Sequence, residues 1–253
     1  MQSICLITGA SSGLGRALAL EYAAQGWKVL AVARNVERLA DLVKSSVDAN
    51  SQGQIVPISL DVTDSKAVDT YMQQIGALVP QLDLVLLNAG TCEYVDLPDW
   101  PLDAFNRTFA LNFHAVAMMV PKLLPLLQQA KSPKFAIVSS LAHYFPFTRA
   151  EAYGASKAAL SYFTDSLRVD LAGSGLQVTL IEPGFIDTPL TQANDFTMPF
   201  MLKADDAAKR IAKAIDGGAL RFRFPKRLVF SLSLLNLLPY NLRQRVAAGM
   251  KQQ

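Results

Sequence analysis

The sequence predicts an α/β protein in which helices cover both faces of a central parallel β-sheet, a doubly wound arrangement. Short runs rich in Val, Ile and Leu alternate along the chain with longer amphipathic segments. Such runs are typical of strands buried on both faces, and their alternation with helices is typical of a parallel sheet. A glycine-rich turn directly after the first apolar run is a third indication.

The expected strands are short apolar runs bounded by turn residues, at 3–8, 28–33, 54–60, 82–88, 134–140 and 176–182. Between them lie segments with apolar residues at helical spacing, at 14–25, 36–49, 65–78, 102–129 and 151–172. No linker rich in Pro, Gly or Ser divides the chain. We therefore expect one α/β domain over residues 1–225 and a basic, apolar helical tail over residues 226–253.

The composition is that of a compact globular protein. Apolar residues make up 51% of the 253 residues and charged residues 18%, which excludes a disordered or collagen-like chain. The net charge of +3 arises from 24 basic and 21 acidic residues, a balance that does not indicate nucleic-acid binding. Cys5 and Cys92 are too few for a disulfide framework. With no signal-peptide pattern and no run of about 18 apolar residues, we expect a cytoplasmic protein.

Residues 8–15 read TGASSGLG and lie between the first expected strand and the first expected helix. Glycines let the backbone turn tightly and approach a pyrophosphate, whose charge is met by free N–H groups at the helix N-terminus. The spacing G-x-x-x-G-x-G differs from the common dinucleotide fingerprint, and a structural turn also uses Gly and Ser. Taken alone, the loop is a weak indication of dinucleotide binding.

The end of the second expected strand bears on the type of dinucleotide. An acidic residue there binds the ribose 2′-hydroxyl of NAD, but this chain has Ala33 followed by Arg34. The planar guanidinium of Arg34 suits a 2′-phosphate. We therefore expect NADP(H) to be preferred over NAD(H); the alternative is that Arg34 only caps an exposed strand end.

Tyr153 and Lys157 are four residues apart in an expected helix, so their side chains lie on one face. A phenol has a pKa near about 10, and a neighbouring ammonium group stabilises the phenolate and lowers that pKa. Tyr153 could then act as a general acid or base. Isolated pairs of this kind are often only solvated side chains, so their meaning depends on the surrounding motifs.

Further motifs accompany this pair in a fixed order. They are TGASSGLG at 8–15, Asp61-Val62, Asn88-Ala89-Gly90, Asn112, Ser140, YGASK at 153–157 and Pro183-Gly184. With these motifs, residues 3–190 resemble the short-chain dehydrogenase/reductase family, here its shorter single-domain type with a Rossmann fold. The resemblance implies an enzyme that transfers a hydride between a nicotinamide cofactor and a carbonyl or alcohol.

The resemblance also implies a catalytic set of Asn112, Ser140, Tyr153 and Lys157. Ser140 is chosen over Ser139 because the family's serine lies thirteen residues before its tyrosine. Ser140 would hold the substrate oxygen and Tyr153 would protonate it. Lys157 would tune Tyr153 and bind the nicotinamide ribose, and Asn112 would fix Lys157 through a water.

By the same resemblance, Asp61 and Val62 would flank the adenine, residues 88–90 would lie under the cofactor, and Thr188 would bind the carboxamide. No metal site is expected. The expected cofactor-binding residues are Gly9, Ser11, Ser12, Gly13, Leu14, Gly15, Arg34, Asp61, Val62, Asn88, Ala89, Gly90, Tyr153, Lys157, Pro183, Gly184, Ile186 and Thr188.

The segments that normally shape the substrate pocket of this fold are rich in apolar side chains, namely Tyr144, Phe145, Pro146, Phe147, Phe185, Phe196, Met198, Phe200, Met201 and Leu202. They predict an apolar pocket for a lipophilic ketone or aldehyde; alternatively, about half of them close the core or a lid. His143 could contact substrate or be a hydrogen-bonded structural residue.

The C-terminal region departs from the family pattern. Residues 187–199 are polar and mixed, and residues 221–224 do not resemble the usual Gly-rich ending, which leaves the C-terminal architecture and the oligomer interface open. Residues 219–253 hold seven Lys or Arg and no acid, whereas the first 218 residues carry a formal charge of −4. The apolar run at 228–238 suits an interfacial helix at a membrane surface, a homodimer or homotetramer contact, or a cover for the core.

The main prediction is an NADP(H)-dependent oxidoreductase that acts on a carbonyl or alcohol, and two other functions remain possible for this fold. A catalytically silent NADP-binding scaffold or sensor could keep the same fold, because fold does not fix function. The intact Ser140, Tyr153 and Lys157 argue against it. A nucleotide-sugar epimerase or dehydratase would usually carry a longer C-terminal region.

Overall fold

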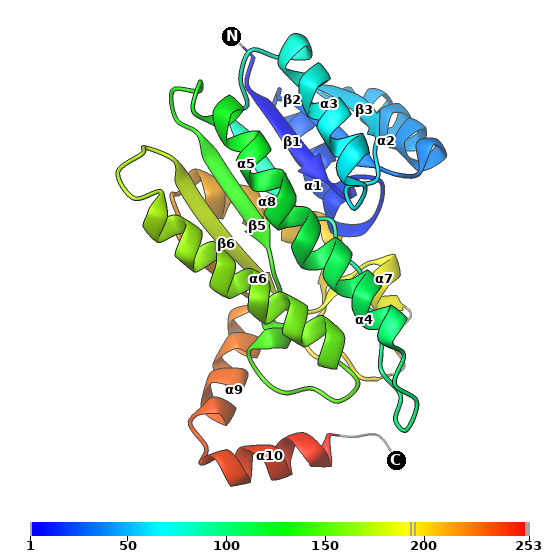
Figure 1. Cartoon of the computed structure of the whole chain (residues 1–253), viewed down its shortest axis with the longest axis vertical. Helices are drawn as coiled ribbons and strands as arrows, with labels where there is room; N and C mark the ends of the chain where they lie inside the picture. The colour runs from blue at the N-terminus through cyan, green and yellow to red at the C-terminus, as the bar shows by residue number, and fades with distance from the viewer. Residues whose placement is uncertain (1, 193, 195, 251–253) are drawn as a thin grey trace.

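The computed structural model describes residues 2–192, 194 and 196–250; residues 193 and 195 of the segment that departs from the family pattern, and residues 251–253 of the expected tail, lie outside it. Seven strands form one parallel sheet in the order β3-β2-β1-β4-β5-β6-β9 (Figure 1). Their bounds are β1 Ile4–Thr8, β2 Lys28–Ala33, β3 Gln54–Ser59, β4 Leu84–Leu87, β5 Lys134–Val138, β6 Gln177–Pro183 and β9 Arg221–Phe224. The predicted doubly wound α/β fold is confirmed.

Helices cover both faces of this sheet. Helices α1 (Gly13–Ala24), α2 (Val36–Asp48) and α8 (Ala204–Asp216) share one apolar cluster with it. Helices α3 (Ser65–Leu78), α5 (Ala115–Leu127) and α6 (Glu151–Asp170) share a second cluster with it. Because side chains alternate along a strand, Cys5 and Ile7 of β1 belong to the first cluster, and Ile4 and Leu6 belong to the second.

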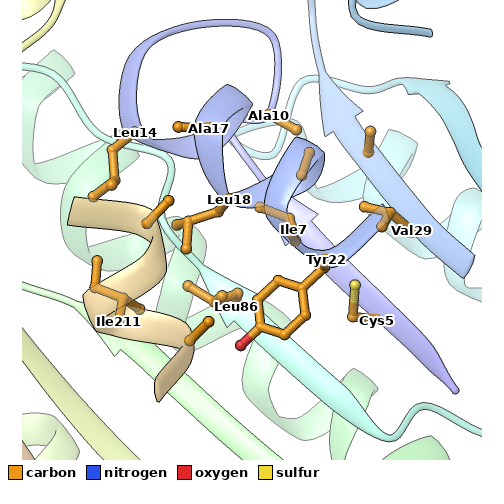
Figure 2. Packing of buried hydrophobic residues seen from close by; sticks show 14 of the residues in the cluster. Cys5, Ile7, Ala10, Leu14, Ala17, Leu18, Tyr22, Val29, Leu86 and Ile211 are labelled. Atoms are coloured by element: carbon orange, nitrogen blue, oxygen red, sulfur yellow. The ribbon is translucent and has the colours of Figure 1, made fainter. Parts of the chain in front are cut away.

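Helix α1 packs against both the sheet and α8 and contributes to the first cluster. Figure 2 shows Leu18 and Tyr22 of α1 near Ile7 and Leu86 of the sheet, with Ile211 of α8 beside them. These five side chains have no more than 1% of their surface exposed. This packing fixes the N-terminal turn of α1 at the carboxyl edge of the sheet, where the site lies.

The predicted helix over residues 102–129 contains an irregular turn. It begins as α4 (Leu102–Phe109), passes through a π-helical turn η1 (Ala110–His114) and continues as α5 to Leu127. The prediction of one continuous α-helix over these residues is therefore wrong. Hydrophobic periodicity cannot reveal one wider turn, because the apolar stripe continues on both sides of it. The buried Asn112 lies within this turn.

By length and composition, Leu102–Leu127 is also one helix that could cross a membrane, since its most apolar window of 18 residues has a mean hydropathy of 1.4. The side chains of Met119, Leu123 and Leu127 nevertheless lie buried in the cluster against the sheet. This is the packing of a core helix.

Arg221–Phe224 completes the sheet, although its sequence departs from the family pattern. Strand β9 pairs in parallel with β6, with Ile181 opposite Phe222 and Pro183 opposite Phe224. The chain then forms helices α9 (Lys226–Asn236) and α10 (Tyr240–Gly249), which lie at the end of the molecule farthest from the N-terminus (Figure 1). The remaining short elements are η2 (Leu141–His143), β7 (Ile186–Asp187), α7 (Pro189–Gln192) and β8 (Leu202–Lys203).

Candidate active site

A cavity of about 350 Å³ opens along the carboxyl edge of the sheet, at the ends of β1, β2, β4, β5 and β6. Strands β1 and β4 are neighbours although β2 and β3 lie between them in sequence, so the order of strands reverses at this point. Doubly wound folds bind ligands at such a switch point. Every cofactor-binding residue expected from the sequence lines this cavity.

The glycine-rich loop brings its backbone close to the cavity at the start of α1. A Cβ atom at Gly15 would lie 2.2 Å from the carbonyl oxygen of Gly9, and Gly13 adopts φ +52°. Both positions therefore require glycine. The first turn of α1 contains no acidic side chain, so its free N–H groups present an uncompensated positive end to the cavity. These residues fit a pyrophosphate.

The end of β2 places two guanidinium groups beside the same cavity. Arg34 follows the strand, and Arg38 lies in the first turn of α2, which is capped by the Asn35 side chain 2.6 Å from the Arg38 N–H. The Arg34 side chain is 72% exposed and lies 3.7 Å from the Asp61 carboxylate. Burial alone would raise the pKa of Asp61, but hydrogen bonds from Thr63 and the charge of Arg34 lower it. Asp61 is therefore an anion that partly neutralises Arg34.

Residues 88–90 are held against β1 by a threonine. The hydroxyl of Thr8 accepts the backbone N–H groups of Asn88 and Ala89, each at 3.0 Å. The Asn88 amide donates in return to the Thr8 carbonyl oxygen at 3.1 Å. These bonds fix the turn after β4 as one wall of the cavity.

Ser140, Tyr153 and Lys157 meet at the floor of the cavity, although they come from two elements. Ser140 follows β5, and its Oγ accepts the N–H of Ala142 at 3.1 Å. Its side chain is also hydrogen-bonded to Tyr153. Tyr153 and Lys157 lie one turn apart on α6, with Nζ 5.9 Å from the centre of the phenol ring. The structure thus brings together three of the four expected catalytic residues.

Ser139 also lines the cavity, but its hydroxyl is engaged elsewhere. It lies 2.7 Å from the Ser161 hydroxyl and donates to the Lys157 carbonyl oxygen at 2.9 Å. Both partners belong to α6, so Ser139 ties the end of β5 to that helix. This geometry favours Ser140 as the hydroxyl available to a substrate.

Burial changes the acidity of both titratable groups at the cavity floor. The expected lowering of the Tyr153 pKa by Lys157 is wrong for the cofactor-free protein: burial raises this pKa to about 12, although the hydrogen bond from Ser140 acts in the opposite direction. Burial also lowers the pKa of Lys157 to about 8. Lys157 is 3% exposed, and its ammonium group donates to the Val138 carbonyl oxygen at 3.0 Å. Its other donors remain available to a ligand in the cavity, as a ribose diol would require.

Asn112 lies behind the cavity and does not belong to its lining. Its amide donates to the Thr91 carbonyl oxygen and the Ser156 hydroxyl, both at 2.9 Å, and its Oδ1 accepts the Thr91 N–H at 2.8 Å. A methyl group at Gly90 would lie 3.2 Å from Asn112 Oδ1 and 3.4 Å from Lys157 Nζ. The two polar atoms therefore face a common space beside Gly90, and a linking water between them stays a prediction.

The chain after β6 forms the remaining wall. Pro183, Gly184, Ile186 and Thr188 line the cavity, as expected. The turn into α7 is closed by Thr191, whose hydroxyl donates to the Ile186 carbonyl oxygen at 2.5 Å and accepts the Thr188 N–H at 3.0 Å.

None of the apolar residues expected around the substrate belongs to the lining of this cavity. Tyr144, Phe145, Phe147 and Phe185 form a third apolar cluster with Leu141 and with α9, in which Phe145 is 2% exposed. This group therefore closes a core. Phe196 instead makes edge contacts with Tyr94 and Phe185, at centroid distances of 6.2 and 6.0 Å.

His143 is engaged with a buried carboxylate. Its Nε2 lies 2.5 Å from Oε1 of Glu182, a residue of β6 whose side chain is fully buried. The other oxygen of Glu182 accepts Nε of Arg223 at 2.7 Å and lies 3.2 Å from Nε of Arg221. Burial alone would raise the pKa of Glu182, but the hydrogen bonds from His143 and Arg223 and the charges of Arg223 and Arg221 lower it. His143 is therefore a hydrogen-bonded residue, one of the two roles expected for it, and its network joins η2, β6 and β9.

Sequence reasoning missed several lining residues, and one of them had a usable signal. Arg38 follows Arg34 by four residues at the start of an amphipathic helix, which brings both to one side of the turn. The others adjoin predicted positions or lie in α7 and η1: Val32, Ala33, Asn35, Leu60, Leu111, Val138, Ser139, Pro189, Leu190 and Thr191. Among the described residues, no group of three or more His, Cys, Asp or Glu could hold a metal ion.

Comparisons with known proteins agree with this architecture. The sequence profile described as short chain dehydrogenase matches residues 3–198. An uncharacterized oxidoreductase of Myxococcus xanthus is 38% identical over 92% of each chain. Sulfoacetaldehyde reductase 2 of Chromohalobacter salexigens is 32% identical over 76% of this chain and 75% of its own. The crystal structure of a 3-ketoacyl-ACP reductase from Sinorhizobium meliloti covers 87% of this chain and 96% of its own, with a TM-score of 0.77; at 24% identity it shows the fold.

Proposed function

Because this chain belongs to the short-chain dehydrogenase/reductase family and is a nicotinamide-dependent oxidoreductase, we propose that it prefers NADP(H) and acts on a lipophilic carbonyl or alcohol. The observation that carries the activity is the meeting of Ser140, Tyr153 and Lys157 at the floor of one cavity. Each of these side chains has a separate task there. The proposal assigns these tasks from the geometry and chemistry of the groups.

The three side chains act on the oxygen atom of the substrate. In the reductive direction, Ser140 holds the carbonyl oxygen by a hydrogen bond, and Tyr153 gives that oxygen its proton. The Lys157 ammonium favours the phenolate that remains on Tyr153 and binds the nicotinamide ribose. The bound nicotinamide supplies the hydride that reaches the carbonyl carbon.

The preference for NADP(H) rests on the charges beside the ribose position. Ala33 stands where NAD enzymes use an acid, and Arg34 and Arg38 lie together at the cavity rim. A 2′-phosphate would meet two guanidinium groups and could displace the long 3.7 Å contact between Arg34 and Asp61. This arrangement supports the phosphate-bearing cofactor.

The substrate class rests on three aromatic side chains that pack together outside the lining of the cavity. Tyr94, Phe185 and Phe196 form a row of edge contacts, which supports a lipophilic carbonyl substrate. The similarity to a sulfoacetaldehyde reductase makes a short charged aldehyde the alternative substrate to test.

The rate of NADPH oxidation with aldehydes and ketones of graded chain length, and with sulfoacetaldehyde, distinguishes a lipophilic substrate from a charged one. A preference for the charged aldehyde would contradict the lipophilic assignment.

Tyr153→Phe tests the activity. The variant removes only the acidic proton, so turnover should fall by about 100-fold or more while NADPH affinity stays nearly unchanged. The assay compares kcat with NADPH affinity measured by fluorescence. A variant that retains more than roughly a tenth of the wild-type kcat would contradict the role of Tyr153. If the wild-type protein binds NADPH but turns over no carbonyl or alcohol in the panel, the silent scaffold is favoured instead.

Ala33→Asp combined with Arg34→Leu tests the cofactor preference. The new carboxylate would accept the ribose hydroxyls of NADH and repel a phosphate. Loss of a charge-assisted contact worth about 1.5–3 kcal/mol should weaken NADPH binding by roughly ten- to a hundredfold. Both cofactors are measured on both proteins. If the ratio of affinities does not change, Arg34 is only a strand cap.

A further inference from the structure

Helix α9 has one face packed on the protein and the opposite face exposed. Leu228 and Leu232 are 6% and 4% exposed and pack in the third apolar cluster with Leu141 and Phe145. The Asn236 amide also donates to the Tyr144 carbonyl oxygen at 2.7 Å. The helix is therefore held firmly against the segment that follows Ser140.

The outer face of α9 carries large apolar side chains with no protein cover. Phe230, Leu234 and Leu237 follow one another at helical spacing and are 66%, 50% and 80% exposed. Tyr240 and Leu242 continue this surface into α10, at 66% and 45% exposure. We call these five residues the tail patch. It lies at the end of the molecule that α9 and α10 form in Figure 1.

The tail patch is surrounded by cations. Lys226, Arg227 and Arg245 are exposed and Arg243 is half-buried. Arg227 shares the outer face of α9 with Phe230 and Leu234, because it precedes them by three and seven residues. Residues 217–253 contain no Asp or Glu. Within the described ranges, none of these four cations has a carboxylate within salt-bridge distance.

We propose that the outer surface of α9 and α10 binds an anionic lipid bilayer at its interface. An exposed apolar stripe with a cationic border is the pattern of a helix that lies in the headgroup region. The eleven residues of α9 are too few to span the hydrocarbon core. A second copy of this chain fits less well, because self-pairing of this surface would bring the same uncompensated cations together.

This orientation places the site next to the lipid. The inner face of α9 contacts Leu141, the residue after Ser140, and Phe185, which follows the Pro183-Gly184 wall of the cavity. Binding itself does not depend on the proposed activity, because it uses only the outer surface. The test therefore needs no substrate.

Co-sedimentation with vesicles tests the proposal with the full chain. Wild-type protein should bind vesicles with about 30 mol % phosphatidylglycerol at least about tenfold more strongly than pure phosphatidylcholine vesicles, and salt should weaken this binding. Arg227→Gln with Arg245→Gln should weaken binding about fivefold per cation. Phe230→Ser with Leu234→Ser and Leu237→Ser should weaken it about tenfold or more.

The matched control replaces three exposed aliphatic residues elsewhere, Val47→Ser, Leu78→Ser and Val169→Ser, and should bind like wild type. Light scattering reports the oligomeric state of every protein. Failure of the wild type to bind anionic vesicles overturns the proposal, as does unchanged binding by the charge variant or the apolar variant. If wild type does not bind vesicles and the apolar variant forms a smaller oligomer than wild type, the tail patch is a contact between copies of the chain. This result also overturns the proposal.

Discussion

Replacing Lys157 by Met should make the cofactor-free protein more stable at neutral pH while impairing its activity. Lys157 is 3% exposed, and burial lowers the pKa of its ammonium group to about 8. An unfolded lysine has a pKa of about 10.4, so the shift of roughly 2.4 units corresponds to at most about 3 kcal/mol of destabilisation. Met has a similar length and no charge to bury.

The substitution also has a cost. The Val138 carbonyl oxygen would lose the donor that lies 3.0 Å away, at about 1–3 kcal/mol. We therefore expect a net stabilisation of about 1 kcal/mol at pH 7, or about 2–4 °C in Tm for a chain of this size. Between about pH 8 and 10.4 the folded wild type releases the Lys157 proton while the unfolded chain keeps it, so wild-type stability rises with pH. Over this range the advantage of the variant should disappear.

Urea unfolding of cofactor-free wild type and Lys157→Met at several pH values measures this difference. The exposed Lys209 provides the control, because Lys209→Met should show no comparable pH dependence. The same variant should bind NADPH more weakly and turn over more slowly. A variant that is less stable than wild type at pH 7, with a difference independent of pH, would refute the reasoning that burial of this charge is costly.

Three further changes test other parts of the site. Gly15→Ala should weaken NADPH binding at least about tenfold, measured by fluorescence titration, because its Cβ would lie 2.2 Å from the Gly9 carbonyl oxygen; unchanged affinity would show that the loop can move aside. Arg38→Leu should weaken NADPH severalfold and leave NADH unchanged; equal losses would exclude a phosphate contact. Glu182→Gln should lower the free energy of unfolding by about 2–4 kcal/mol at pH 7. The pKa of Glu182 is lowered in the folded protein, so its contribution to the free energy of unfolding is present above about pH 4.3 and is lost as the pH falls through the folded pKa. Denaturation curves of wild type and variant should therefore converge in acid.

The sequence best predicts those parts of the fold whose pattern of apolar residues is visible within one short segment. Strands β1 and β2 are continuous apolar runs, and their pairing follows once helices must cover both faces. Strand β9 has a weaker sequence signal, because Arg221 and Arg223 alternate with Phe222 and Phe224 at the edge of the sheet. At an edge, polar residues can reach solvent or partners such as Glu182, so the strand lacks the continuous apolar signal.

In the site, too, residues that are close in sequence can be placed together from the sequence, whereas contacts between distant segments cannot. Tyr153 and Lys157 lie one turn apart on a helix, so their proximity is readable from spacing alone. The position of Asn112 in a π-helical turn, behind the cavity, depends on packing that no periodicity records. A hydrogen-bonded His143 was one expected alternative, but its partner Glu182 lies 39 positions away, and no local pattern identifies it.

The site buries polar groups that need hydrogen-bond partners from the protein or from a ligand. Ser139, Ser156 and Lys157 are at most 3% exposed in a core that is otherwise largely apolar. Each such group is costly unless it is hydrogen-bonded. Ser139 and Ser156 are satisfied within the protein, by α6 and Asn112, whereas Lys157 keeps donors for a ligand. A bound ribose would therefore remove a cost that the free protein carries, so part of the stability of the site is supplied by the cofactor itself.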